Sequence, residues 1–202
     1  MMLEIKLPEQ YTGGQTDNSE TISIESSDLA KQKYKKIKNK LLDINNWHII
    51  AEGLSGIFIL TDDQGKDKKG LPKVDDFIKI KIPIPGPISG EGFDWVKIEN
   101  IQESFDSNED NEYLFFTLRP GTNPHDESEV TAHFYTNEST NSFSLVREKE
   151  KITVSINGRN EVPNKSQSEG IDKIRNQGIA IGAIFGMADP QWKNLIVGLF
   201  KD

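Results

Sequence analysis

The sequence predicts an α+β protein in which a curved antiparallel sheet of six to seven strands is covered by an N-terminal amphipathic helix and a C-terminal glycine-rich helical segment. Three observations support this prediction. Strand-like segments follow one another between Gly53 and Val162, a lysine-rich amphipathic stretch precedes them, and a segment with regularly spaced glycines follows them. Strands joined by short polar loops are expected to pair antiparallel, and a sheet of this size must curl or pack on something. A β-barrel with flanking helices is the alternative.

The composition indicates a soluble, acidic protein. The chain has 202 residues, a net charge of −8 and no cysteine. The negative charge argues against nucleic-acid binding, and the lack of cysteine excludes disulfides and thiolate metal sites. The first residues do not resemble a secretory signal and no apolar run is long enough to span a membrane, so we expect a cytoplasmic protein. The polar, glycine-bearing start predicts a flexible arm at residues 1–20, followed by a single α+β domain at residues 21–202.

The first regular elements are a strand and a helix. Residues 21–25 alternate in the manner of a strand, and Ser26, Ser27 and Asp28 then offer side-chain oxygens that can cap a helix. The apolar residues that follow step by four and three and therefore share one helix face, with lysines on the remainder. These apolar residues are Ala30, Tyr34, Ile37, Leu41 and Ile44. We expect this helix to stop near Asn45.

The central feature of the sequence is a hairpin between residues 75 and 104. Its two strand-like runs, at residues 77–82 and 93–99, alternate apolar and polar residues. The connection between them is rich in proline and glycine, so it cannot continue the ladder of hydrogen bonds. A connection this long is more than a minimal turn, and we expect it, together with aromatic residues at the start of the second run, to be available for contact with a partner protein. The residues in question are Pro85, Gly86, Pro87, Phe93 and Trp95.

Further strands are predicted on both sides of this hairpin, bounded by turn residues. Their ranges are residues 56–60, 113–118, 130–135, 142–147 and 151–157. The acidic turn at residues 104–112 lacks the glycine and the spaced glutamate of a calcium loop, so we expect no metal there.

The C-terminal segment carries Gly178, Gly182 and Gly186 at every fourth position. In a helix this spacing builds a smooth face that lets a ligand or another backbone come close. Alternatively, the glycines break the segment into loops. Asp189 followed by Pro190 resembles a helix start, which predicts a separate closing helix at residues 191–200.

Four polar residues lie in or next to predicted strands and are candidates for ligand binding, together with Gly178 and Gly182. They are Arg119, His133, Arg159 and Glu161. Arg159 and Glu161 lie two apart, so they share one side of a continuing strand, where the guanidinium group could hold a carboxylate or phosphate. The alternative is a partly buried network that clasps the last strand to the C-terminal segment. His133 and Glu161 could form an acid/base pair, but no nucleophile accompanies them.

The order of these elements, together with the segment Leu41-Leu42-Asp43-Ile44-Asn45-Asn46-Trp47 at the end of the first helix, resembles the START-like (helix-grip, SRPBCC) superfamily. The resemblance covers residues 21–188. It implies a curved sheet wrapped around a C-terminal helix, with a hydrophobic ligand bound between the two. The proline-rich loop and the helix after Pro190 depart from that pattern, and the superfamily has no shared catalytic motif to carry over.

Two functions therefore remain open. The first is binding of a small hydrophobic or amphipathic ligand between sheet and C-terminal helix. The second is a protein-protein interaction or assembly role of the loop at residues 83–92, with a partner protein or a second copy of the chain. We favour a non-enzymatic protein and expect no catalytic residue, no cofactor and no metal, since no phosphate loop, dinucleotide fingerprint or nucleophile motif is present.

Overall fold

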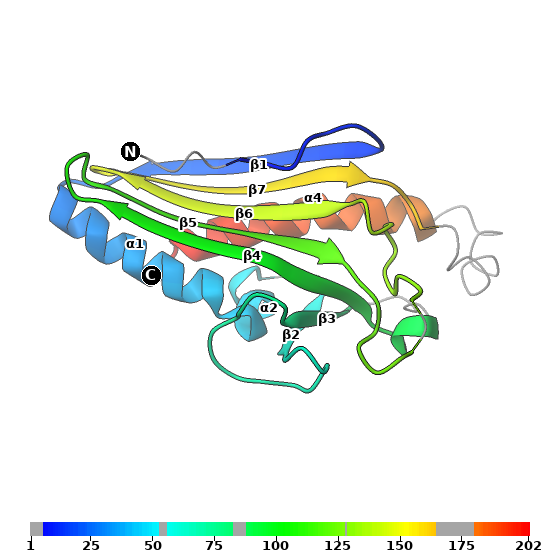
Figure 1. Cartoon of the computed structure of the whole chain (residues 1–202). Coiled ribbons are helices and arrows are strands. Elements are labelled where there is room, and N and C mark those ends of the chain that lie inside the picture. The colour runs from blue at the N-terminus through cyan, green and yellow to red at the C-terminus, as the bar shows by residue number, and fades with distance from the viewer. Residues whose placement is uncertain (1–5, 53–55, 83–87, 128, 165–179) are drawn as a thin grey trace.

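The computed structural model describes residues 6–52, 56–82, 88–127, 129–164 and 180–202. Seven strands form one antiparallel sheet in the order β1-β7-β6-β5-β4-β3-β2 (Figure 1). The strands are β1 (Gly14–Ser23), β2 (Ile57–Thr61), β3 (Phe77–Lys81), β4 (Asp94–Asp106), β5 (Asn111–Pro120), β6 (Thr140–Glu148) and β7 (Lys151–Glu161). Because β1 and β2 lie at opposite edges, the sheet is open, and the predicted curved sheet is found rather than the alternative barrel.

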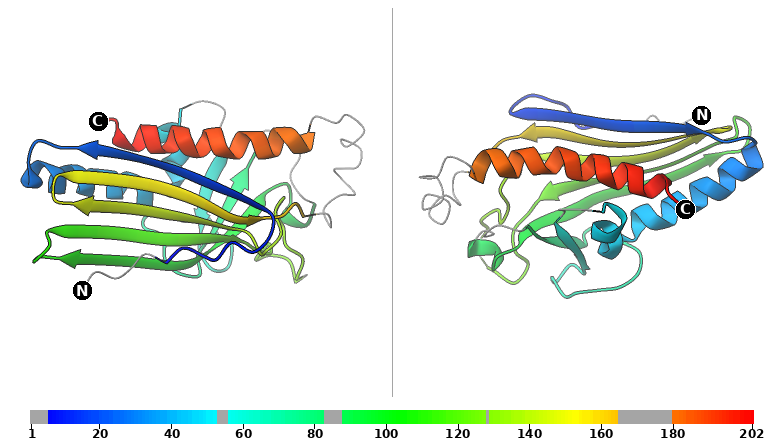
Figure 2. Two further views of the ribbon diagram at one scale, coloured as in Figure 1. Left: turned by 90° about the horizontal axis from the view of Figure 1, so that it is seen from above. Right: turned by 180° about the vertical axis from the view of Figure 1, so that it is seen from behind.

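Helices cover one face of this sheet. They are α1 (Ser27–Leu42), the short η1 (Ile44–Asn46) and α2 (Trp47–Ile50), and the long α4 (Ala180–Phe200), and a further turn, η2 (Ile88–Gly90), follows β3. Figure 2 shows α1 and α4 on the same side of the curved sheet, with α4 running along β1 and β7. We call this side the concave face. The other side carries hydroxyl pairs such as Ser19 with Ser155 and Thr21 with Thr153, each 2.8 Å apart between their oxygens.

Helix α1 forms as its sequence predicts. The side chain of Ser26 accepts a hydrogen bond from the backbone N–H of Leu29, which is an N-cap. The apolar stripe that includes Tyr34 and Ile37 is buried against the sheet, and the lysines stay on the solvent side. The helix therefore owes its position to the burial of one face.

The core lies between the concave face and the helices. On β7, Ile152, Val154 and Ile156 are fully buried, while the intervening residues face the other side of the sheet. This alternation is the period-two pattern of a strand with one buried face. The central hairpin of the sequence is β3 and β4, which pair antiparallel with Ile78 opposite Val96.

Two predicted boundaries differ from the structure. Residues 14–20 were expected in a flexible arm, but they belong to β1, which pairs with β7 along its length. The predicted strand at residues 130–135 is not a strand; it makes only isolated bridges, such as Thr131 with Thr122. Its backbone bonds to neighbouring loops and strand ends instead, as when the N–H of Trp95 donates to the carbonyl of Ala132 at 2.8 Å.

The predicted separate helix at residues 191–200 is also wrong. A single helix, α4, begins at Ala180 and continues through Pro190 to Phe200. Asp189 does not start a helix. Its carboxylate instead accepts hydrogen bonds from Asn18 of β1 at 2.9 Å and from Lys193 at 2.6 Å. The predicted glycine-rich segment, residues 171–188, starts before this helix, and its residues 171–179 lie outside the described part of the chain.

Candidate functional site

One part of the interface between sheet and α4 is filled by aromatic side chains. The indole of Trp47 stacks on Phe143 with ring centres 5.1 Å apart, and the ring of Trp192 from α4 meets Phe143 edge-on at 5.3 Å. Phe58 and Phe116 complete the group, at 5.3 and 6.4 Å from Trp47. We call these five residues the aromatic cluster. Its rings pack on one another at this position.

Polar and small residues replace the aromatic ones farther along the same face. The strand register places Asn141 of β6 opposite Gly158 of β7, and Gly158 opposite Thr16 of β1. Two residues before Gly158, Ile156 belongs to the core and lies opposite Asn18. We call Thr16, Asn18, Asn141, Gly158 and Glu161 the polar end of the concave face.

Glu161 folds back over the glycine in this polar end. A Cβ atom on Gly158 would overlap both the carboxylate of Glu161 and the hydroxyl of Thr16. The Thr16 hydroxyl donates to the Glu161 carboxylate at 3.2 Å. The side-chain oxygen of Asn141 is buried and has no hydrogen-bond partner among the described residues. The polar end thus has an acceptor whose bonding capacity is unused.

The electrostatic environment of Glu161 favours its neutral form. Partial burial raises the pKa of its carboxyl, and the negative charges of Asp189 and Asp17 raise it further. The hydrogen bond from Thr16 and the charge of Arg159 act in the opposite direction, but the pKa of Glu161 stays above its ordinary value. A partly buried carboxyl group of this kind can exchange hydrogen bonds with a polar group of a ligand.

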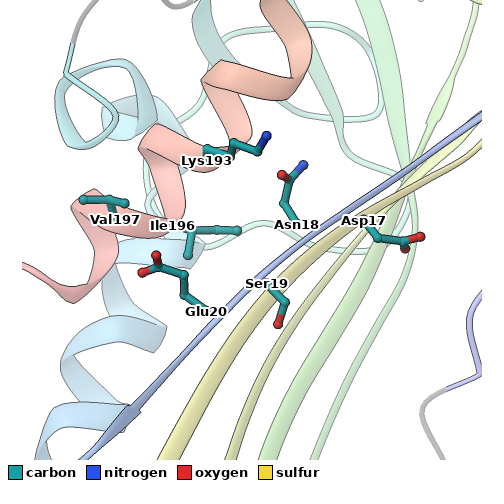
Figure 3. A pocket seen from close by; sticks show the side chains of 7 residues that line it. All are labelled: Asp17, Asn18, Ser19, Glu20, Lys193, Ile196 and Val197. Carbon is teal, nitrogen blue, oxygen red and sulfur yellow. The ribbon is translucent and has the colours of Figure 1, made fainter.

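A groove of about 310 Å³ adjoins the polar end between β1 and α4. Figure 3 shows its lining, with Asn18 and Glu20 on the helix side of β1, and Lys193 and Val197 on α4. Asn18 is 4% exposed and bridges the two elements through Asp189. The groove is therefore the outer margin of the interface that contains the polar end.

Arg159 does not share a side with Glu161. Asn160 between them has φ of 54°, a left-handed backbone angle that ends the regular alternation of the strand. The Arg159 guanidinium group instead forms an ion pair with Asp17 at 2.8 Å and donates to the carbonyl of Gly158 at 2.7 Å. The guanidinium group that was expected to hold a ligand carboxylate or phosphate is therefore already bonded to groups of the protein itself.

The clasp expected at this end of β7 exists, but it holds a different segment. The side-chain oxygen of Asn160 accepts from the backbone N–H groups of Tyr11 and Thr12 at 2.9 and 3.1 Å, and its amide donates to the carbonyl of Glu9 at 2.9 Å. The sequence led us to expect a network that held the C-terminal segment. Asn160 holds residues 9–12, before β1.

No hydrogen bond or ion pair among the described residues joins His133 or Arg119 to Glu161. His133 is 4% exposed, and its Nδ1 accepts from the backbone N–H of Tyr135 at 3.0 Å. Burial lowers the pKa of His133 to about 3, so the imidazole is neutral. Arg119 forms an ion pair with Glu99 and donates to the carbonyl of Asn137 at 2.8 Å. Neither contact resembles acid/base machinery.

The predicted interaction loop is only partly described. Pro85, Gly86 and Pro87 lie outside the described residues. Phe93 is half-buried, with the ammonium group of Lys79 5.2 Å from its ring centre. Trp95 is 2% exposed, and its indole N–H donates to the carbonyl of Gly90 at 3.2 Å. The expectation that Trp95 is available to a partner is therefore wrong, because it packs in the interior.

Among the predicted glycines, Gly178 lies outside the described residues and Gly182 belongs to α4. The sequence analysis missed Asn141 and Asn18, because polar residues in strands are ordinarily assigned to the solvent side. It also missed Asp94, which is 1% exposed and accepts from the backbone N–H of Phe134 at 2.9 Å. Burial raises the pKa of Asp94 to about 7. The position of Asp94 between the aromatic residues Phe93 and Trp95 was the sequence signal that could have indicated a buried carboxyl group.

Comparison with known proteins bears on the fold. No protein-family model and no curated protein matches the chain. A hypothetical protein of Helicobacter pylori has a similar structure, with a TM-score of 0.50, 10% identity, and coverage of 98% of this chain and 96% of the other. At this identity the likeness shows the fold alone. The chain is thus an α+β protein whose open, curved sheet grips a C-terminal helix.

Two further structures are less similar. Norcoclaurine synthase from Thalictrum flavum has a TM-score of 0.34 and 11% identity, with 92% of this chain and 96% of the other covered. The protein Ara h 8.0201 has a TM-score of 0.37 and 13% identity, with 94% of this chain and 100% of the other covered. Scores this low carry no argument about function.

The described residues contain no helix with the length and hydropathy needed to cross a bilayer. Within the same ranges, no three histidine, aspartate or glutamate side chains gather in a way that could hold a metal ion.

Proposed function

We propose that this protein binds a small amphipathic ligand between the concave face and α4, with the polar part of the ligand at the polar end. The observation that carries the proposal is the unsatisfied, buried side-chain oxygen of Asn141. Asn141 lies opposite Gly158 in the sheet, and the returning carboxyl group of Glu161 covers Gly158. Buried polar atoms are normally paired, so an unpaired acceptor beside a desolvated carboxyl group is a natural partner for a ligand donor.

The apolar part of such a ligand has a matching environment. The polar end lies on the same face as the core residues Ile156 and Phe143, and the segment of α4 before Asp189 is apolar and glycine-bearing in sequence. Ligand sites in proteins combine mostly apolar walls with a few placed polar groups. The aromatic cluster supplies a rigid end wall, because its rings pack on one another.

The proposal is tested by titration with Nile red, a neutral dye whose fluorescence rises in apolar sites. We expect the wild-type protein to bind the dye, and Gly158→Leu to bind it at least about tenfold more weakly, because the new side chain takes the space of the Glu161 carboxyl group. Asn141→Leu is a second variant, which fills the same region from β6. Thr153→Leu is the matched control, since Thr153 is on β7 but on the opposite side of the sheet.

Near-ultraviolet circular dichroism first establishes that the variants are folded. If folded Gly158→Leu and Asn141→Leu then bind the dye as well as the wild type does, the dye binds elsewhere. The absence of any dye binding by the wild-type protein would also count against the proposal.

A further inference from the structure

The two edges of the sheet differ in whether their outward backbone N–H and C=O groups are hydrogen-bonded. At the β2 edge, the backbone N–H of Leu60 donates to the side chain of Asn45 at 2.9 Å, and its carbonyl accepts from the N–H of Lys68 at 2.9 Å. Thr61 also forms a bridge with Asp67. The outward backbone groups of Leu60, in this five-residue edge strand, are therefore satisfied by neighbouring parts of the chain.

The β1 edge has no such cover among the described residues. β1 is ten residues long and pairs only with β7. The N–H of Ile24 donates to the carbonyl of Glu150, which lies directly opposite, so even-numbered residues direct their backbone groups toward β7. Asp17, Ser19 and Thr21 therefore direct their N–H and C=O groups outward. The close hydroxyl pairs of Ser19 and Thr21 with β7 support this assignment. Side chains approach most closely at pairs whose backbone groups do not bond to each other.

β1, with the sequence GQTDNSETIS, also lacks the lysine and proline residues that commonly protect an edge strand, and its charged side chains are the acidic Asp17 and Glu20. A single irregularity in register, between Gly14 and Thr16, lies at one end and leaves the rest of the strand regular. Residues 17–23 thus form an open template for one more strand.

The groove beside this edge defines what kind of strand fits. On its α4 side the groove is lined by Val197, which is 45% exposed, and by Ile196, which is buried. The charges of Asp17 and Lys193 are already paired, with Arg159 and Asp189 respectively. Glu20 points to the helix side of β1 (Figure 3) and forms no ion pair with a described residue.

We propose that the β1 edge binds an extended, basic segment of another protein as an added strand, with a lysine or arginine toward Glu20 and apolar residues toward Val197. Main-chain hydrogen bonds provide affinity in this mode of recognition, and alternate side chains provide selectivity. A second copy of this chain is a poor occupant, because the protein carries a net charge of −8 and β1 itself is acidic. Ser19, Glu20 and Val197, on which this inference rests, are not part of the polar end, so the inference does not depend on the proposed ligand.

The probe is a fluorescein-labelled peptide, Thr-Val-Thr-Lys-Thr-Val-Thr, titrated into the full chain and followed by fluorescence anisotropy. Its valines and lysine share one side of a strand. We expect binding, and an at least about tenfold weaker affinity when glutamate replaces the central lysine. Ser19→Pro removes an outward N–H and should reduce affinity by at least about tenfold, while Ser19→Ala, the matched control, leaves it unchanged.

Glu20→Lys keeps the test decisive if Ser19→Pro does not fold, since it should reverse the preference between the lysine and glutamate peptides. The variant Gly158→Leu should bind the peptide normally, which separates this inference from the ligand proposal. Equal binding of both peptides, undiminished binding to folded Ser19→Pro, or no binding would overturn the inference. Self-association of the wild-type protein in sedimentation that Ser19→Pro abolishes would also overturn it, because the occupant would then be a second copy.

Discussion

The contact between α4 and α2 is tight enough that a single methyl group should disturb it. Gly198 of α4 lies against the backbone of Ile50, the last residue of α2. A Cβ atom at position 198 would overlap the Ile50 carbonyl oxygen and lie 2.8 Å from its carbonyl carbon. Because these are backbone atoms, no rotamer change can relieve the overlap. The substitution Gly198→Ala must therefore push the two helices apart.

Two opposing effects decide the size of the change. Alanine in place of glycine within a helix stabilises it by about 1 kcal/mol. Overpacking of a tight contact costs about 1–3 kcal/mol, and a backbone clash belongs at the upper end of that range. We therefore expect the free energy of unfolding of Gly198→Ala to fall by about 2 kcal/mol.

The assay is urea unfolding followed by tryptophan fluorescence, which reports on Trp47 and Trp192 in the aromatic cluster. With a denaturant slope of about 2 kcal/mol per molar urea, the midpoint should fall by about 1 M. Val197→Ala is the control, because Val197 is 45% exposed and its loss should change stability by less than about 0.5 kcal/mol. A Gly198→Ala protein as stable as the wild type, or more stable, would refute the packing of α4 on α2 described above.

Three further predictions concern buried charge. Burial raises the pKa of Asp94 to about 7. The free energy of unfolding should therefore decline as pH rises from about 4 to 7, by up to about 1.4 kcal/mol per pH unit. Comparison of the wild type with Asp94→Asn across this range isolates that decline. Burial lowers the pKa of His133 to about 3, so its effect on the free energy of unfolding has the opposite sign: stability is lost as pH falls below about 6.5. His133→Asn should remove that loss. Identical profiles of unfolding free energy against pH for wild type and variant would contradict this prediction. Arg147 is fully buried and its guanidinium group lies 2.9 Å from Glu112, so Arg147→Met should cost about 3–5 kcal/mol in urea unfolding. Arg119→Met, at a half-exposed ion pair, should cost at most about 1 kcal/mol, and equal losses for the two variants would be contrary to this account.

Elements with local signals could be predicted from the sequence. The Ser26 cap and the apolar stripe through Tyr34 located α1 correctly, because both depend on residues within one helix. The alternating runs at residues 77–82 and 93–99 identified β3 and β4 for the same reason. In each case the periodicity of the side chains reports directly on which face is buried.

Elements that depend on distant partners could not be predicted. Residues 14–20 are polar and become a strand because β7 offers them a partner about 140 residues later, as in the bond of Asn157 to Asp17. The run around His133 was predicted as a strand, but its backbone bonds to loops and to the start of β4 rather than to a ladder. Asp189 followed by Pro190 predicts a helix start, yet α4 continues through Pro190.

The candidate site was predicted only in part. Glu161 was singled out from the sequence and lies in the polar end. Arg159 was singled out with it but is directed to Asp17, because the left-handed backbone at Asn160 is a local conformation that alternation cannot foresee. Asn141 could not be found at all, since its role depends on which strand pairs with β6 and in which register.

The central claim is that the polar end and α4 enclose a ligand. Its most direct test is mass spectrometry of the purified protein under native and denaturing conditions, for the wild type and for Gly158→Leu. We predict an additional mass on the native wild-type protein that is lost on denaturation and is absent from the native Gly158→Leu protein. A wild-type mass equal to that of the bare chain in both conditions, or an additional mass retained by Gly158→Leu, would contradict the account.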